Sequence, residues 1–326
     1  MDEYGITQGP DGTFVVLDEG NYRVLTFDGR GTLVGEFGSQ GESAEAFGYP
    51  VAMLGPRNDT IRVLDGRSAS YKIFNSQGEF LGQERVDEIF GLRNQQRLVR
   101  DGVVVVREVG YRSDEPTVSD HLMLVRSGGD TLPLATLVKP AWALFSVPEC
   151  QIVSIPIPPV FETELIWDAM GDVVAVNDGP EYVVQVFEGG VENRRLERPI
   201  VADEVNREVA LRKIGPGSGV GVGDRRCRFD PEEELETRGF EKRRQVVSDL
   251  RVDGDGWVWA RRHAASLSEP DRLVVDVFDS DGVYRGTLPE ASPWPATFTA
   301  EGGVVALEVD DLGIQSYVVY SIDRGE

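Results

Sequence analysis

Short apolar runs separated by glycine, aspartate and asparagine recur along the chain. The first set comprises Thr13–Leu17 (TFVVL), then Tyr22–Phe27 after a polar hairpin, then Thr32–Phe37 after a glycine turn. Runs of this length that are rich in β-branched and aromatic residues are typical of β-strands. Because the connections between them are short, the pattern predicts consecutive antiparallel strands.

The chain also repeats itself. Residues 11–35 align without a gap with residues 58–82, at a constant offset of 47. The residues shared at equivalent positions are Thr13 and Thr60, Val16 and Val63, Leu17 and Leu64, Asp18 and Asp65, Phe27 and Phe74, Gly31 and Gly78, and Gly35 and Gly82. A repeat of roughly 40–50 residues indicates a propeller or a solenoid, in which each repeat is one supersecondary unit.

A shorter spacing extends the repeat down the chain. An aspartate followed nine positions later by an aromatic residue occurs in four units, as Asp18 and Phe27, Asp65 and Phe74, Asp178 and Phe187, and Asp311 and Tyr320. Four independent occurrences of this spacing predict a structural role for these residues. Two further units, 101–137 and 253–288, keep the same plan but contain long hairpins at 107–120 and 260–272.

These units predict an all-β fold, a six-bladed β-propeller of four-stranded antiparallel blades in a single domain over residues 1–326. The expected blades are 5–50, 51–88, 89–137, 138–200, 247–290 and 291–326. The last blade contains few strand-like runs. We therefore expect either a three-stranded last blade or a chain that continues upstream of Met1.

Residues 201–246 interrupt the pattern between blades 4 and 5. The segment is too long for a connection between blades, and long insertions in compact folds are usually functional or disordered. Ala202–Lys213 has the composition of a helix, with Asp203 as the expected N-cap. The glycine-rich stretch 215–223 is expected to be a flexible linker. We predict a helix and a loop laid over one mouth of the propeller.

The first repeat resembles the NHL repeat and the wider group of bacterial six-bladed propellers. The residues that carry this resemblance are Asp18, Asn21, Arg23, Val24, Phe27, Asp28 and Gly31. The second unit keeps Asp65, Phe74 and Gly78 but has Ser68 and Ser70 where the pattern has Asn and Arg. The resemblance implies that Asp18 and Arg23 brace a hairpin. It also implies an exported or lipid-anchored protein, whereas a true start at Met1 would imply a cytoplasmic one.

Charge and composition exclude several classes of function. The 326-residue chain has a formal net charge of −23, which disfavours binding to nucleic acid through phosphate neutralisation. The sequence contains no apolar run long enough for a transmembrane helix. A monomer is expected.

Few residues in the sequence are suited to a metal site or to catalysis. Cys150 and Cys227 lack metal-ligand spacing and are expected to be buried thiols, although a disulfide between them is an open alternative. The only histidines, His121 and His263, lie in different blades, so a zinc centre dominated by histidine is disfavoured. No cofactor is expected, although an oxygen-only calcium site in the central channel stays open. The segment Asp253–Gly256 is expected to be a β-turn and not a calcium loop.

The long hairpins provide the candidate ligand-binding residues at the mouth, which are Arg107, Tyr111, Trp259, Arg261, Arg262 and His263. If the hairpin of blade 5 faces the same mouth as the insertion, it would offer cations and aromatic rings to an anionic ligand. The alternative is a solvated hairpin in which these cations pair with Asp271 or Glu269.

The sequence therefore favours a non-enzymatic propeller that binds a protein, peptide or carbohydrate at one face. The alternative is a metal-dependent, calcium-type hydrolase or lyase acting in the central channel. Fold alone does not decide between them, because propellers host both functions.

Overall fold

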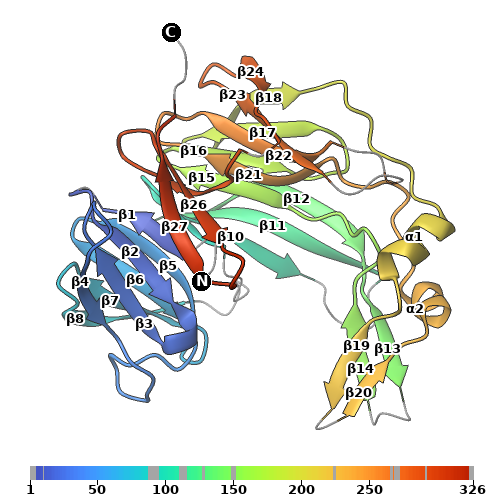
Figure 1. Cartoon of the computed structure of the whole chain (residues 1–326), viewed down its shortest axis with the longest axis horizontal. Helices are drawn as coiled ribbons and strands as arrows, with labels where there is room; N and C mark the ends of the chain where they lie inside the picture. Colours follow the sequence, from blue (N-terminus) through green and yellow to red (C-terminus); the bar gives the residue numbers. More distant parts are fainter. Residues whose placement is uncertain are drawn as a thin grey trace.

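The computed structural model describes residues 5–9, 11–86, 95–109, 116–126, 129–147, 152–222, 225–264, 267, 272–290 and 292–322. Antiparallel sheets account for six blades arranged in a ring, which confirms the predicted six-bladed propeller. The first blade, drawn in blue, lies beside the last, drawn in red, and their contact closes the ring (Figure 1).

The first three blades each have four strands. Blade 1 comprises β1 (Ile6–Gln8), β2 (Phe14–Asp18), β3 (Arg23–Phe27) and β4 (Leu33–Phe37). Blade 2 comprises β5 (Pro50–Arg57), β6 (Thr60–Asp65), β7 (Ser70–Asn75) and β8 (Phe80–Arg85). Blade 3 comprises β9 (Arg97–Val99), β10 (Gly102–Val109), β11 (Thr117–Arg126) and β12 (Thr131–Pro140).

Blades 4 and 5 also have four strands, and the described part of blade 6 has three. Blade 4 comprises β15 (Ile166–Met170), β16 (Val173–Asn177), β17 (Val183–Glu188) and β18 (Val191–Glu197). Blade 5 comprises β21 (Val247–Val252), β22 (Val258–His263), β23 (Leu273–Phe278) and β24 (Tyr284–Thr287). Blade 6 comprises β25 (Pro295–Phe298), β26 (Val304–Val309) and β27 (Gln315–Tyr320), in line with the expected three-stranded last blade.

Apolar clusters close five of the six seams between neighbouring blades. One cluster joins blades 1 and 2, and others join blades 3 and 4, 4 and 5, 5 and 6, and 6 and 1. Within the described residues, no such cluster joins blades 2 and 3. There, the buried apolar cluster of Val51, Ala52 and Leu64 stays within blade 2.

The segments between blades 3 and 4 and between blades 4 and 5 form a lobe that projects from the ring (Figure 1). It contains two hairpins, β13 (Ala143–Val147) with β14 (Ile152–Ile157) and β19 (Gly219–Val222) with β20 (Arg225–Arg228). It also contains the helices α1 (Arg207–Ile214) and α2 (Pro231–Arg238). Its core is the apolar cluster of Val160, Val205, Ala210 and Leu235.

This lobe differs from the sequence prediction in three ways. The stretch 138–200, assigned to one blade, contains the separate hairpin β13–β14 as well as blade 4. The glycine-rich stretch 215–223 is not simply a linker, because Gly219–Val222 pairs as a strand with Arg225–Arg228. Helix α1 begins after Asn206, whose side chain accepts a hydrogen bond from the Val209 N–H at 2.9 Å.

The predicted N-cap, Asp203, has a different role. Its carboxylate lies 2.8 Å from Arg244 Nη2, so it anchors the returning end of the insertion. In the described residues, the wall of the central cavity includes no residue of 201–246. The insertion packs against residues 160–161, and its placement over the mouth stays a prediction. No helix of the described chain is long and apolar enough to cross a membrane.

The aromatic centre of the first seam gives a test of this packing. Phe74 is 2% exposed, and its ring centroid lies 4.8 Å from that of Phe37 and 5.7 Å from that of Phe47. The variant Phe74→Ala is expected to lower the free energy of unfolding by about 3–5 kcal/mol, because it removes buried area and leaves a cavity. Urea denaturation followed by tryptophan fluorescence measures this loss. Val191→Ala, at an exposed position, is the control and should change the stability by less than about 0.5 kcal/mol.

Candidate functional site

The innermost strands of all six blades surround a central cavity of about 220 Å³. These strands, β1, β5, β9, β15, β21 and β25, each contribute to its wall. Its polar side chains come mainly from blades 3, 4 and 5, where Gln96, Arg97, Asp168 and Arg251 lie on or beside neighbouring inner strands. The first part of the candidate site is therefore a narrow channel whose charged residues lie on one side.

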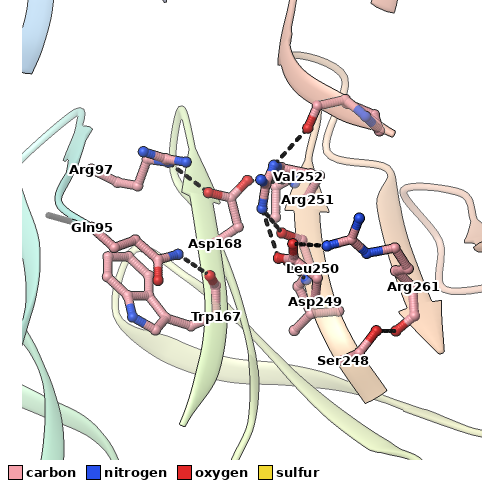
Figure 2. Close-up of polar contacts among 11 residues, drawn as sticks. Gln95, Arg97, Trp167, Asp168, Ser248, Asp249, Leu250, Arg251, Val252 and Arg261 are labelled. Atoms are coloured by element: carbon pink, nitrogen blue, oxygen red, sulfur yellow. Dashed lines mark hydrogen bonds and ion pairs between the residues drawn. The ribbon is translucent and has the colours of Figure 1, made fainter. Parts of the chain in front are cut away.

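An ion pair links the neighbouring blades 3 and 4 at the wall of this channel. Arg97 Nε lies 2.6 Å from Asp168 Oδ1, and the Asp168 side chain is only 4% exposed. The second carboxylate oxygen accepts a hydrogen bond from the Val252 N–H of blade 5 at 2.9 Å. Figure 2 shows Asp168 between Arg97 and β21. A single carboxylate thus joins three consecutive blades, with both of its oxygens engaged.

A second charged group joins blades 5 and 6. Arg251 is 1% exposed, and its Nη1 donates to Asp249 Oδ1 at 2.7 Å, while its Nε donates to the Pro295 carbonyl at 2.8 Å. The other Asp249 oxygen accepts from Arg261 Nη2 at 2.9 Å (Figure 2). Both guanidinium groups also lie over the Trp294 ring, at 5.1 Å for Arg251 and 4.6 Å for Arg261. These cation–π contacts stabilise the two cations beside blade 6.

The acidic groups of the channel already bind donors within the protein. Asp168 and Asp249 each bind donors with both oxygens, so neither offers an unoccupied carboxylate edge to a cation. Across the described ranges, no group of three or more histidine, cysteine, aspartate or glutamate side chains is placed to hold a metal ion. The segment Asp253–Gly256 forms a turn, in which Asp253 Oδ1 accepts from the N–H groups of Asp255 and Trp257.

The four long departures from the repeat emerge at one end of the ring. In an antiparallel blade, the start of the first strand and the hairpin between the second and third strands lie at the same end. Val247, at the start of β21, pairs with Arg262, near the end of β22. We call this end the insertion face. The strand ends that lead into the connections 141–165 and 198–246 and into the hairpins 110–116 and 264–272 all lie at this end.

The hairpin of blade 5 contacts the lobe directly. Leu267 is partly buried against the apolar cluster that contains Val160 and Leu235. At the base of the hairpin, the His263 N–H donates to the Val246 carbonyl at 3.3 Å. The hairpin of blade 5 therefore lies at the same mouth as the insertion, which was the condition for a shared ligand site.

The structure separates the candidate mouth residues instead of gathering them. Neighbouring side chains on a strand point to opposite faces, so Arg261 contacts Asp249 towards blade 6, whereas Arg262 contacts Asp276 and faces blade 4. Trp259 is buried against Phe298 of blade 6. His263 ends β22 and is partly exposed.

The remaining mouth candidates lie in blade 3. Arg107 is on β10, opposite His121 on β11, and lines a different cavity between blades 2 and 3. Tyr111 and Cys150 lie outside the described residues, as do Glu269 and Asp271, the expected partners of the blade 5 hairpin.

The repeat residues occupy structural positions in the hairpins and seams. Asp18 Oδ2 accepts from Asn21 Nδ2 at 2.9 Å and from Arg23 Nε at 2.9 Å, which ties β2 to β3. Asp65 accepts from the N–H groups of Gly48 and Tyr49, and Asp178 accepts from Gln185 Nε2.

Their aromatic partners vary more in burial. Phe74 and Phe187 are buried in seam clusters, and Phe27 is partly buried against the cluster between blades 6 and 1. Tyr320 is partly exposed and donates from its hydroxyl to Glu308. Asp311 is exposed in the turn between β26 and β27, where the neighbouring Asp310 accepts the turn hydrogen bonds from Leu312 and Ile314.

Sequence reasoning did not identify Arg97, Asp168, Asp249 or Arg251. One signal was present, because Asp249 and Arg251 place two charges in a strand that otherwise reads as buried. A charge inside an apolar strand requires a partner. Asp249 finds its charged partners, Arg251 and Arg261, within blade 5. Arg97 and Asp168 lie in different blades, 71 positions apart, so the local pattern could not predict their contact.

Comparisons with known proteins support the fold alone. No family model matches the chain, and no curated protein matches it. A solved structure of a candidate exported protein from Bacteroides fragilis NCTC 9343 is similar, with a TM-score of 0.53, 11% identity, and coverage of 95% of this chain and 80% of that one.

Two other solved structures are similar at lower scores. A member of the DUF4221 family from Bacteroides vulgatus ATCC 8482 has a TM-score of 0.46 and 9% identity, with 93% of this chain and 86% of that one covered. A catalytically inactive virginiamycin B lyase from Staphylococcus aureus, with quinupristin, has a TM-score of 0.39 and 7% identity, with 96% and 83% covered. The propeller architecture is supported, whereas the NHL-repeat identity is not confirmed by a family match.

The Arg97–Asp168 pair provides a test of the channel. Asp168→Asn is expected to lower the free energy of unfolding by about 3–5 kcal/mol, because it leaves a largely buried guanidinium without its counter-charge. The double variant Arg97→Gln with Asp168→Asn should recover part of that loss. Urea denaturation of the wild type, both single variants and the double variant gives the coupling energy. Strictly additive losses would contradict the pairing.

Asp276 gives a pH-dependent test near the predicted residue Arg262. Burial opposes ionisation of this carboxyl, but hydrogen bonds from Arg262, Thr287 and Arg198 outweigh it and hold the pKa of Asp276 below its usual value. A lowered folded-state pKa contributes stability that is present above the unfolded value of about 4 and is lost as the pH falls further.

The stability difference between the wild type and Asp276→Asn should therefore be largest near pH 7 and shrink below about pH 4. Urea denaturation across this pH range measures it. Asp311→Asn, at an exposed turn position, is the control and should follow the wild type. A constant difference at all pH values would contradict a lowered pKa.

Proposed function

We propose that this chain is a non-enzymatic binding propeller that recognises a protein, peptide or carbohydrate at the insertion face. The observation that carries the proposal is that the strand ends leading into the connections 141–165 and 198–246 and into the hairpins 110–116 and 264–272 all lie at one end of a regular ring. Loops placed on a rigid scaffold are where binding residues concentrate.

The channel beneath this face supports a recognition role. Its charged side chains already bind one another, through Arg97 with Asp168 and through Asp249 with two arginines. Groups held in this way stiffen the platform, because each holds neighbouring strands or blades together. In this proposal the channel uses no metal or other cofactor, and calcium belongs to the hydrolase or lyase alternative.

Location and assembly complete the proposal. An exported or lipid-anchored protein, which the repeat resemblance implies, suits the recognition of an external peptide or glycan. The chain is proposed to act as a monomer, with its insertion face open to the partner.

Binding selections with substituted chains test the choice of face. The purified chain is screened against a random peptide library and a glycan array, and the tightest binder is measured by calorimetry. Exposed insertion-face positions are then replaced one at a time, as Tyr49→Ala, Arg212→Ala and Lys213→Ala. At least one of these should weaken binding by about tenfold or more, which corresponds to about 1.4 kcal/mol.

Matched controls come from the opposite end of the ring. Val191→Ala and Val283→Ala replace exposed apolar side chains beside the turns that precede β18 and β24. They should change the affinity by less than about twofold, within the usual effect of a surface substitution. A binder that responds to these positions and not to the insertion face would refute the assignment.

Metal analysis separates the proposal from its alternative. The wild type is expected to contain no stoichiometric divalent ion after purification without chelators, and calcium should leave its melting temperature unchanged. One tightly bound divalent ion per chain would favour the channel hydrolase or lyase.

A further inference from the structure

The seam between blades 2 and 3 contains a cavity of about 800 Å³. This is the same seam in which no apolar cluster joins the described residues of the two blades. Polar contacts bridge it instead. Tyr71 donates from its hydroxyl to Gln96 Oε1, and Arg57 Nη1 donates to the Val99 carbonyl at 2.9 Å.

Strand alternation explains both walls of this cavity. On β6, Ile61 and Val63 pack towards blade 1, so Arg62 points to the other face, towards blade 3. On β10, Val104 and Val106 pack towards blade 4. The intervening side chains, Val103, Val105 and Arg107, therefore face blade 2 and line the cavity.

Five arginines line this cavity, which are Arg57, Arg62, Arg85, Arg107 and Arg126. Glu84 is the only carboxylate among its described lining residues. This excess of positive charge lies in a chain whose formal net charge is −23. A cavity with this charge balance attracts anions locally, although the protein as a whole repels them.

Two of these cations have no counter-charge. Across the residues that the structure describes, Arg62 and Arg107 form no ion pair, whereas the arginines of the channel all contact carboxylates. Arg62 and Arg107 are also partly buried. Partly buried cations without a partner cost free energy, and a bound anion would remove that cost.

The apolar lining of the cavity further limits the class of ligand that it can bind. Val103, Val105 and Val125, together with Met123, provide an apolar surface between the cations. Burial and the negative charge of Glu84 raise the pKa of Tyr71, so its phenol stays a neutral hydrogen-bonding group at the edge of this surface. A cavity of this size lies within the range of about 300–1,000 Å³ found for small-molecule sites.

We propose that the cavity between blades 2 and 3 binds a small organic anion that carries two or more carboxylate or phosphate groups on an apolar body. Arg62 and Arg107 bind the acidic groups, because a planar guanidinium suits both carboxylate and phosphate. The apolar floor contacts the body of the ligand. The proposal rests on the lining of the seam between blades 2 and 3, so it does not depend on the proposed function.

Calorimetry of the full chain at low salt, in metal-free buffer at pH 7, tests the site with two kinds of anion. Benzene-1,3,5-tricarboxylate probes carboxylate binding and ATP probes phosphate binding. Benzene-1,3,5-tricarboxamide and adenosine are their neutral counterparts. Binding of one anion per chain, about tenfold or more tighter than its neutral counterpart, supports the proposal. Binding of the tricarboxylate or of ATP shows whether the site takes carboxylate or phosphate groups.

Single substitutions locate the binding. Arg62→Gln and Arg107→Gln should each weaken anion binding by about tenfold or more, because each loses a charge-assisted contact. Glu84→Gln should strengthen it. Arg195→Gln is the control and should change affinity by less than about twofold, because Arg195 is exposed on blade 4 and pairs with Glu192.

A stability readout distinguishes a ligand site from a structural role. Without ligand, Arg62→Gln should melt at or above the wild-type temperature, because it removes a cation that has no counter-charge. With the anion present, the wild type should be stabilised more than the variant. The proposal is overturned if neither anion binds, if both Arg variants bind as tightly as the wild type, or if ligand-free Arg62→Gln melts at a lower temperature.

Discussion

The need to cover both faces of every sheet determines this architecture. A four-stranded blade has two faces, and neither is polar enough to be left in water, so each blade packs against a neighbour on each side. The two-residue period of a strand divides its side chains between the two seams. On β22, Trp259 packs towards blade 6, whereas Ala260 packs towards blade 4. Since five seams are filled by apolar clusters, room for a ligand is confined to the channel, the mouths and the remaining seam.

Charged contacts supplement this packing where the inner strands converge. The centre of the ring is too narrow for large apolar clusters, and backbone groups of neighbouring blades come close together there. Asp168 and Arg251 satisfy such groups by accepting from the Val252 N–H and donating to the Pro295 carbonyl. Each is itself neutralised by a partner, so blades 3 to 6 are joined by paired charges. Among the described residues, the seam between blades 2 and 3 contains neither an apolar cluster that joins the blades nor an ion pair, and the cavity of about 800 Å³ lies there.

Local repetition made the ring of blades predictable from the sequence. The helix cap and the contacts between blades in the channel were not predicted, because they depend on residues that are distant in sequence. Asp18 and Phe27 lie on or beside paired strands of one hairpin, so their spacing is visible in the sequence. Arg97 and Asp168 meet only because blades 3 and 4 are neighbours, and no spacing between them encodes that contact. The helix cap was misplaced for a related reason. Asp203 and Asn206 have similar capping ability, and the ion pair with Arg244 decides between them.

The same limit applies to the candidate mouth residues. Arg261, Arg262 and His263 are consecutive in sequence, which suggested one cationic patch, but consecutive strand residues must face alternate seams. Asp249 and Asp276 then neutralise the two arginines on separate sides of blade 5. Arg107 resembled them in sequence and differs in outcome, because blade 2 provides no described carboxylate opposite it except Glu84. The presence of a nearby carboxylate, and not the identity of the residue itself, decides whether an arginine is structural or open to a ligand.

The acidic surface and the cationic seam act on an anionic ligand at different distances. At physiological ionic strength, charges separated by more than about 8 Å of water are largely screened, so the net charge of −23 slows approach mainly at low salt. Once the ligand enters the seam, Arg62 and Arg107 act at contact distance and in partly buried surroundings, where screening is weaker. Added salt should therefore weaken the contact attraction while it relieves the long-range repulsion, and the two effects oppose each other in the affinity. In a basic protein, both the long-range and the contact interactions would attract the anion, so added salt would weaken both. Selectivity for a compact anion over a nucleic acid follows from the same argument, since a long polyanion would meet the acidic surface along its whole length, whereas a small ligand contacts only the arginines of one seam.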